Sequence, residues 1–267
     1  MDKDRFSILD FKRKKVSGEK ITMLTAYDYP MAMIIDKAGI DAILVGDTLN
    51  MVVLGRESTV SVTMDEMIHH CKAVRRGTRR AFLIGDMPFM SFQASSEDAV
   101  RNAGRFVKEA GCDAVKLEGG REVVERIRSI VTAGIPVLGH IGLTPQSSSK
   151  LGGYKVQGKD AETAKRLMTD AADLEKAGCF AVVIECVPRE LALKITKHVS
   201  IPTIGIGAGN HCDGQVLVTH DMIGLFDGFL PKFVKKYADI GNSIRESICS
   251  FKKETETGIF PDDSHSY

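Results

Sequence analysis

Eight short apolar segments alternate with amphipathic helical stretches along almost the whole chain. Continuous apolar runs bounded by turn signals are typical of parallel strands that are buried on both faces. Parallel neighbours need helical crossovers, and eight such strands close without an exposed edge. The alternation therefore predicts a (β/α)8 TIM barrel, with an open doubly wound sheet as the alternative. The predicted strands cover residues 21–26, 42–45, 82–85, 114–117, 137–139, 181–184, 203–206 and 215–219.

Capping signals mark several of the intervening helices. Thr63 and Glu66 form a capping box before a helix over residues 64–76, and Gly77 is placed to provide a left-handed C-cap. Ser95 or Ser96 begins the next helix, which ends at Gly111. A short helix before the first strand is expected to close the floor of the barrel. The remaining predicted helices cover residues 7–15, 160–177, 189–198 and 239–253.

Length and charge limit the function classes. The chain has 267 residues and 43% hydrophobic content, which suffices for one large α/β domain, and no linker or repeat interrupts it. We therefore predict a single barrel domain over residues 1–267. Lys and Arg number 36 against 35 Asp and Glu, so no overall field favours nucleic acid or a membrane surface. A small-molecule ligand is the expected partner.

Cysteine usage and the N-terminal segment predict a cytoplasmic protein. The six cysteines include no C-x-x-C pair, and three lie in apolar or helical patterns that bury free thiols. The chain begins with charged residues and no apolar h-region follows. No apolar run approaches the roughly 18 residues of a membrane span.

Carboxylates follow three of the predicted strands, at Asp47, Asp86 and Glu118. In barrel enzymes the reactive groups lie at the carboxyl ends of the strands. Carboxylate oxygens without clustered Cys or His suit Mg²⁺, which keeps several water or substrate oxygens. A metal site is one interpretation, and helix capping by each carboxylate is the other.

Each of the other polar side chains at the strand ends has two possible roles, one in function and one in structure. Lys116 and Glu118 share a face of one strand, so they form either a structural ion pair or the site of a carboxylate-bearing substrate. Glu185 ends an apolar run, which suits a general base but also a salt-bridged core residue. His140 either orients a substrate or satisfies buried backbone groups. The other polar residues at these ends are Asp28, Asn210, His220 and Asp221.

One connection, residues 142–159, is long and lacks periodicity, which indicates either a lid or an insertion.

An ordered set of short motifs over nearly the whole chain resembles the ketopantoate hydroxymethyltransferase family. The set is far more specific than any single motif. The motifs are Thr25-Ala26-Tyr27-Asp28, Val45-Gly46-Asp47, Ala73-Val74-Arg75-Arg76-Gly77, Val115-Lys116-Leu117-Glu118-Gly119-Gly120, Gly139-His140-Ile141-Gly142-Leu143-Thr144-Pro145-Gln146, Gly152-Gly153-Tyr154-Lys155-Val156-Gln157-Gly158, Glu185-Cys186-Val187-Pro188 and Gly205-Ile206-Gly207-Ala208-Gly209.

The resemblance implies a (β/α)8 barrel that assembles as a homo-decamer, a pentamer of dimers. It also implies transfer of a hydroxymethyl group from 5,10-methylenetetrahydrofolate to 3-methyl-2-oxobutanoate, giving 2-dehydropantoate and tetrahydrofolate on the route to pantothenate. By motif, Asp47 and Asp86 would hold Mg²⁺, and Glu118 would complete the metal environment directly or through water. Glu185 would accept the proton, and Lys116 would bind the keto acid.

The chain departs from the family pattern at Thr48, where Ser is frequent. The hydroxyl is retained, so we expect the contact with substrate to persist in a slightly tighter pocket. His140 is a further candidate substrate contact. Two rival functions remain: a Mg²⁺-dependent 2-oxo acid lyase of the isocitrate lyase and phosphonopyruvate type, and a non-catalytic scaffold that binds keto acids.

Overall fold

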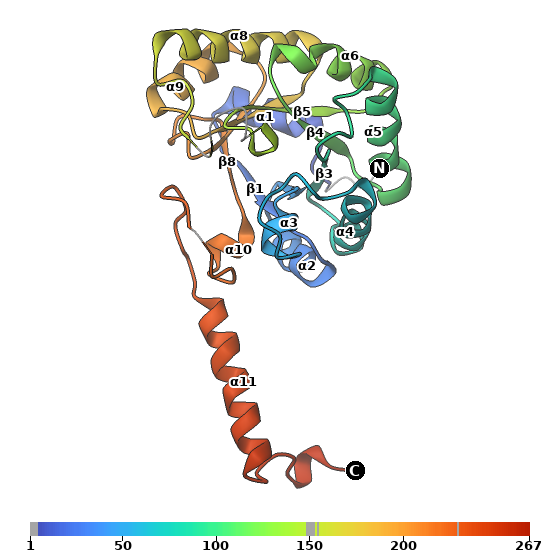
Figure 1. Cartoon of the computed structure of the whole chain (residues 1–267), viewed down its shortest axis with the longest axis vertical. Coiled ribbons are helices and arrows are strands. Elements are labelled where there is room, and N and C mark those ends of the chain that lie inside the picture. Colours follow the sequence, from blue (N-terminus) through green and yellow to red (C-terminus); the bar gives the residue numbers. More distant parts are fainter. Residues whose placement is uncertain (1–4, 148–152, 154, 229) are drawn as a thin grey trace. The chain divides into compact units, whose positions relative to one another are not determined.

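A closed barrel of eight parallel strands forms the centre of the protein. The structure is a computed structural model that describes residues 5–147, 153, 155–228 and 230–267. Each strand pairs with its sequence neighbours, and β1 also pairs with β8, which closes the barrel and confirms the predicted fold (Figure 1). The strands are β1 (Ile21–Thr25), β2 (Ala42–Val45), β3 (Phe82–Asp86), β4 (Ala114–Glu118), β5 (Val137–Gly142), β6 (Ala181–Glu185), β7 (Thr203–Ile206) and β8 (Gly214–Leu217).

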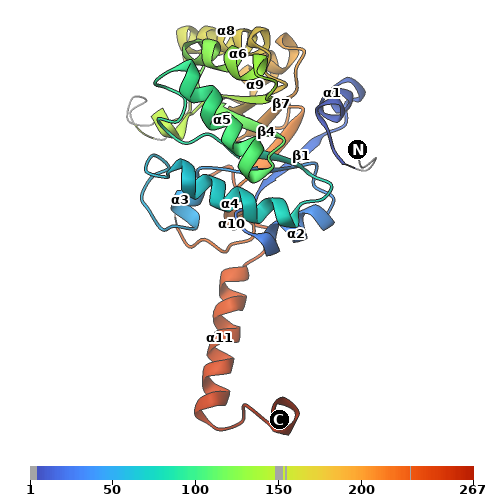
Figure 2. The same ribbon diagram turned by 90° about the vertical axis from the view of Figure 1, so that its right-hand side faces the viewer.

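Helices follow most of the strands and surround the barrel, whereas β7 leads to β8 with no helix in the described residues between them. Neighbouring helices contact one another in chain order, as seen for α4, α5, α6 and α8 on one side (Figure 2). The helices of this unit are α1 (Ile8–Ser17), α2 (Tyr29–Lys37), α3 (Leu49–Val52), α4 (Met64–Gly77), α5 (Ser96–Ala110), α6 (Val124–Thr132), α8 (Ala161–Ala177) and α9 (Arg189–His198), with short 3-10 turns η1 (Arg121–Val123) and η2 (Pro145–Ser147).

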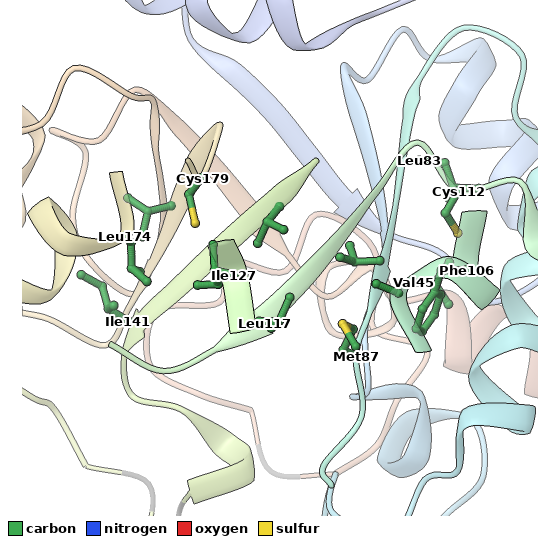
Figure 3. Close-up of a cluster of buried hydrophobic side chains, with 14 of the residues drawn as sticks. Val45, Leu83, Met87, Phe106, Cys112, Leu117, Ile127, Ile141, Leu174 and Cys179 are labelled. Carbon is green, nitrogen blue, oxygen red and sulfur yellow. The ribbon is translucent and has the colours of Figure 1, made fainter. Parts of the chain in front are cut away.

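The strands bury both faces, and successive side chains alternate between two cores. On β3, Phe82 and Ile84 belong to the core inside the barrel, whereas Leu83 belongs to the core between strands and helices. Figure 3 shows part of this outer core, to which Leu83 of β3, Phe106 of α5 and Leu117 of β4 all belong. Burial on both faces explains why the strands read as continuous apolar runs.

The predicted caps are confirmed except at Gly77. The Thr63 and Glu66 capping box starts α4, and Gly111 and Gly178 end α5 and α8 in the left-handed conformation. Gly77 instead remains within α4, and a Cβ at this position would lie 2.6 Å from the Tyr29 carbonyl oxygen. The glycine thus permits close packing of α4 against α2 rather than a chain reversal.

Helix α1 closes the floor of the barrel, as predicted. Phe11 is fully buried, with its ring centroid 5.5 Å from that of Phe82 and 5.1 Å from that of Phe180. Two lysines near the end of the helix anchor it: Lys14 Nζ lies 2.7 Å from Asp41, and Lys15 Nζ lies 2.8 Å from Asp213. Lys14 and Lys15 therefore bind residues of the barrel itself.

Residues 219–267 form a second compact unit, separate from the unit of residues 1–218. The second unit contains α10 (Thr219–Met222), α11 (Ile240–Glu256) and a short turn, η3 (Asp263–His265). The assignment of residues 1–267 to one domain stays a prediction.

No helix in the described residues is long and apolar enough to cross a membrane. Of the connection at 142–159, residues 148–152 and 154 lie outside the described residues.

Candidate active site

All seven residues predicted for the site line one pocket at the carboxyl ends of the strands. The pocket lies within the barrel unit, and β2 to β6 or the turns that follow them supply these side chains. Apolar side chains from β2, β6, β7 and β8 form another part of its wall. The predicted residues in the pocket are Asp47, Thr48, Asp86, Lys116, Glu118, His140 and Glu185.

Lys116 pairs mainly with Asp86, not with Glu118. Parallel register places Asp86 of β3 beside Lys116 of β4, and Lys116 Nζ donates hydrogen bonds of 2.8 Å to both Asp86 oxygens. The distance from Lys116 Nζ to Glu118 Oε1 is 3.7 Å. Nearby carboxylates raise the pKa of Lys116 although burial opposes this, so its ammonium is charged at neutral pH.

Asp47 lies beside this ion pair. Its backbone N–H donates to Asp86 Oδ2 at 3.2 Å, which ties the turn after β2 to the end of β3. Burial, followed by repulsion from Asp86 and Glu118, raises the pKa of Asp47 well above its usual range. Burial also raises the pKa of Asp86, against the opposing effect of Lys116. Burial and the neighbouring carboxylates thus disfavour the ionised form of Asp47.

His140 lies between the two glutamates of the pocket. Its Nδ1 is 3.3 Å from Glu118 Oε1 and its Nε2 is 3.2 Å from Glu185 Oε2, within ion-pair distance but not aligned as hydrogen bonds. Burial and Lys116 lower the pKa of His140, but the two glutamates outweigh them and raise it to about 9. An imidazolium thus links the β4 carboxylate to the β6 carboxylate.

The backbone of Glu185 is fixed by a glycine on the neighbouring strand. Gly142 pairs with Glu185 in parallel register and has a φ of +97°. A Cβ on Gly142 would lie 2.2 Å from the Glu185 carbonyl oxygen, and that oxygen accepts a hydrogen bond from the Leu143 N–H at 2.9 Å. Only glycine satisfies both the backbone conformation and this close approach.

Gln146 is the site residue that the sequence reasoning did not single out. It is buried in η2, donates from Nε2 to Asp47 Oδ2 at 2.9 Å, and donates from its backbone N–H to Glu118 Oε2 at 3.0 Å. Its position in the Thr144-Pro145-Gln146 motif was the available signal.

Two other polar residues at strand ends lie outside the pocket. Asp28 accepts a hydrogen bond from the Met31 N–H and caps α2, and neither Asp28 nor Asn210 lines the pocket.

The residues present suit a hard divalent cation, with few protein ligands. In the described part of the chain, no three His, Cys, Asp or Glu side chains form a ready-made metal cluster. Mg²⁺ needs only one or two carboxylates when water and substrate oxygens complete its shell. The four carboxyl groups and two cationic groups that line the pocket leave excess negative charge, and Glu118 Oε1 is buried without an aligned hydrogen bond. Both observations fit a cation between Asp47, Asp86 and Glu118.

Solved structures with the same fold include enzymes of 2-oxo and related acids. Phosphonopyruvate hydrolase in complex with oxalate and Mg²⁺ aligns with a TM-score of 0.61 and 13% identity over 97% of this chain and 91% of the other. A 2,3-dimethylmalate lyase aligns with a TM-score of 0.60 and 14% identity over the same shares. At this level of identity the likeness shows the barrel fold.

Sequence relatives are much closer. The proteins named 3-methyl-2-oxobutanoate hydroxymethyltransferase from Carboxydothermus hydrogenoformans and Acetivibrio thermocellus are 58% and 56% identical, each over 99% of this chain and over 96% and 93% of the relative. The family model for ketopantoate hydroxymethyltransferase matches residues 5–263. The chain therefore belongs to the ketopantoate hydroxymethyltransferase family.

Proposed function

We propose that this protein transfers a hydroxymethyl group from 5,10-methylenetetrahydrofolate to 3-methyl-2-oxobutanoate, giving 2-dehydropantoate and tetrahydrofolate in pantothenate biosynthesis. The observation that carries the proposal is the convergence of all seven predicted site residues in one pocket. Full-length relatives that carry the corresponding name support it. A lyase or a scaffold on the same barrel would not need this family's ordered set of residues.

Asp47 and Asp86 are the proposed Mg²⁺ ligands, with Glu118 beside them directly or through water. Mg²⁺ bound there supplies Lewis-acid stabilisation of negative charge on the keto acid's oxygens. The complex of phosphonopyruvate hydrolase with oxalate and Mg²⁺, on the same fold, supports a divalent cation here.

The keto acid carries one charged end and one apolar end, and the pocket matches both. Lys116 provides an ammonium for the carboxylate end, and Thr48 provides a hydroxyl. His140 adds a second cation to the lining of the pocket. Leu44, Val183 and other apolar residues of the wall suit the isopropyl group of the substrate. This arrangement fixes the substrate's orientation.

Glu185 is the proposed proton acceptor. It removes the C3 proton, and the electron pair of that C–H bond then forms the new bond from C3 to the one-carbon unit. Both bonds from this carbon to the folate nitrogens N5 and N10 break, and water supplies the hydroxyl group. The two nitrogens take up the C3 proton and the remaining proton of the water, which gives tetrahydrofolate. His140 positions the Glu185 carboxylate from 3.2 Å and balances its charge.

Several broader features also remain proposals. We propose a homo-decamer built as a pentamer of dimers, which analytical ultracentrifugation would test directly. A cytoplasmic location is supported by six free cysteines. The near-zero net charge of +1 supports small-molecule partners and not nucleic acid or a membrane surface.

Substitution Glu185→Gln tests the role of the base. It should abolish exchange of the C3 proton of 3-methyl-2-oxobutanoate with deuterated solvent, followed by NMR, while binding of the keto acid persists. Glu190→Gln is the matched control, because Glu190 is exposed and lies outside the pocket. Exchange at the wild-type rate in Glu185→Gln would remove Glu185 from this role.

A second pair of variants tests the metal ligands. Asp47→Asn and Asp86→Asn should weaken Mg²⁺ binding, because a neutral amide is a poorer ligand for a hard cation than a carboxylate. Isothermal titration with MgCl₂ in the presence of keto acid measures the effect. Unchanged affinity in both variants would refute the ligand assignment.

A further inference from the structure

Gln146 is a buried polar residue in a turn, and its contacts lie at the centre of the site. The residue is 6% exposed and belongs to η2, which directly follows β5. A buried amide is stable only when its donors find acceptors. The partners of Gln146 therefore show what its side chain does.

Both hydrogens of the Gln146 amide have an acceptor. Nε2 donates to Asp47 Oδ2 at 2.9 Å and to the Met87 carbonyl oxygen at 3.0 Å. Because a carboxylate and a carbonyl only accept hydrogen bonds, the orientation with nitrogen toward them is the one that chemistry allows. On the other side, Oε1 accepts from Gln93 Nε2 at 3.4 Å. The amide is thus held in one orientation.

The backbone of the same residue holds a second carboxylate. The Gln146 N–H donates to Glu118 Oε2 at 3.0 Å, while Glu118 Oε1 is buried without an aligned hydrogen bond in the described part of the chain. One residue therefore binds one oxygen of Asp47 and one oxygen of Glu118. Asp47 follows β2 and Glu118 ends β4, and Gln146 restricts the rotation of each carboxylate.

We propose that Gln146 is a positioning residue that sets the orientation in which Asp47 and Glu118 face a divalent cation. The inference rests on the proposed Mg²⁺ site, and it goes further by placing the control of that site in the turn after β5. Groups that hydrogen-bond to metal ligands typically change metal affinity about 10–100-fold when removed. Gln146 acts on two carboxylates, so its loss should fall in this range.

Gln146→Met is the primary test. Methionine has a similar length but no hydrogen-bond donor in its side chain, so the bonds to Asp47 and Met87 are lost, whereas the backbone N–H still donates to Glu118. Isothermal titration with MgCl₂, with and without 3-methyl-2-oxobutanoate, should show a Kd about 10–100-fold above wild type. Gln146→Asn keeps an amide on a side chain too short for both acceptors, and its Kd should rise in the same direction. Gln157→Leu is the matched control, since Gln157 lies in the same connection and its side chain donates to the Lys155 carbonyl oxygen.

Thermal midpoints in a chelating buffer separate positioning from a merely structural role. A structural role would lower the midpoint of Gln146→Met and leave the Mg²⁺ Kd unchanged. A Kd within about twofold of wild type in either folded variant overturns the proposal, as does failure of both variants to fold. Mg²⁺ binding is measured apart from turnover, so a wild-type protein that binds Mg²⁺ without forming 2-dehydropantoate refutes the proposed function and not the role of Gln146.

Discussion

The Lys116–Asp86 pair offers a quantitative test of the site's electrostatics. Lys116 and Asp86 side chains are 5% and 2% exposed, and two hydrogen bonds of 2.8 Å join them. Removal of one partner from a buried ion pair leaves an uncompensated charge and costs about 3–5 kcal/mol. Lys116→Met should therefore lower the free energy of unfolding by this amount, which corresponds to about 6–20 °C in Tm at about 2–4 °C per kcal/mol.

The pH dependence of this loss has a definite sign. Without Lys116, burial and the neighbouring Glu118 still raise the pKa of Asp86, but the ammonium that lowers it is gone. A carboxyl whose pKa is raised in the folded state destabilises the protein fully above that pKa, and this cost declines as the pH falls from the folded-state pKa towards the unfolded-state value. The difference in stability between Lys116→Met and wild type should therefore shrink as the pH falls from neutral to mildly acidic values.

Urea unfolding measures the effect, with two reference variants. Lys176→Met removes an exposed lysine of α8 and should change stability by less than about 0.5 kcal/mol. Replacement of both partners, Lys116→Met with Asp86→Leu, should recover much of the loss because no buried charge is left unpaired. A loss below about 1 kcal/mol in Lys116→Met would refute the argument that a buried carboxylate depends on this ammonium.

Three further variants test the framework around the site. Phe11→Ala should destabilise the protein by about 3–5 kcal/mol in urea unfolding, because Phe11 is fully buried on the barrel floor; a loss under about 1 kcal/mol would contradict its packing role. Gly142→Ala should lower kcat about 100-fold by displacing the Glu185 backbone, whereas Gly104→Ala, where a Cβ has open space, should leave kcat unchanged. Hydrogen bonds from Arg56 and then from Thr63 lower the pKa of Glu66 to about 2, so the stabilisation by its carboxylate is full above pH 4.5 and is lost as the pH falls through about 2. Glu66→Ala should therefore lower the free energy of unfolding by about 1 kcal/mol at pH 7, and its stability should converge with that of the wild type in acid. A cost that does not depend on pH would contradict this.

The strands were predictable because burial on both faces leaves a plain apolar signature. Their ends were less so: β3, β4 and β6 continue through Asp86, Glu118 and Glu185, whereas the apolar runs stop one residue earlier. These three site residues belong to the strands themselves, and their polarity masks this in the sequence. At these strand ends, the polar residues that the site requires replace the apolar residues expected in a buried strand.

The partners within the site were harder to predict than its members. Lys116 pairs with Asp86 because of the register between β3 and β4, which spacing along one strand does not contain. Gln146 interacts with Asp47 across 99 positions of sequence, and no local pattern reports such a contact. Gly77 carries the usual signal of a helix end, but close packing against α2 explains it instead. Tertiary contacts decide each of these cases.

We propose that the pocket of Asp47, Asp86 and Glu185 carries out a Mg²⁺-dependent hydroxymethyl transfer. The most direct measurement is formation of 2-dehydropantoate from 3-methyl-2-oxobutanoate and 5,10-methylenetetrahydrofolate, with Mg²⁺ and with a chelator in parallel. Product should form with Mg²⁺, and the chelator should abolish product formation until Mg²⁺ is added back. A folded protein that forms no product with both substrates and Mg²⁺ would contradict it.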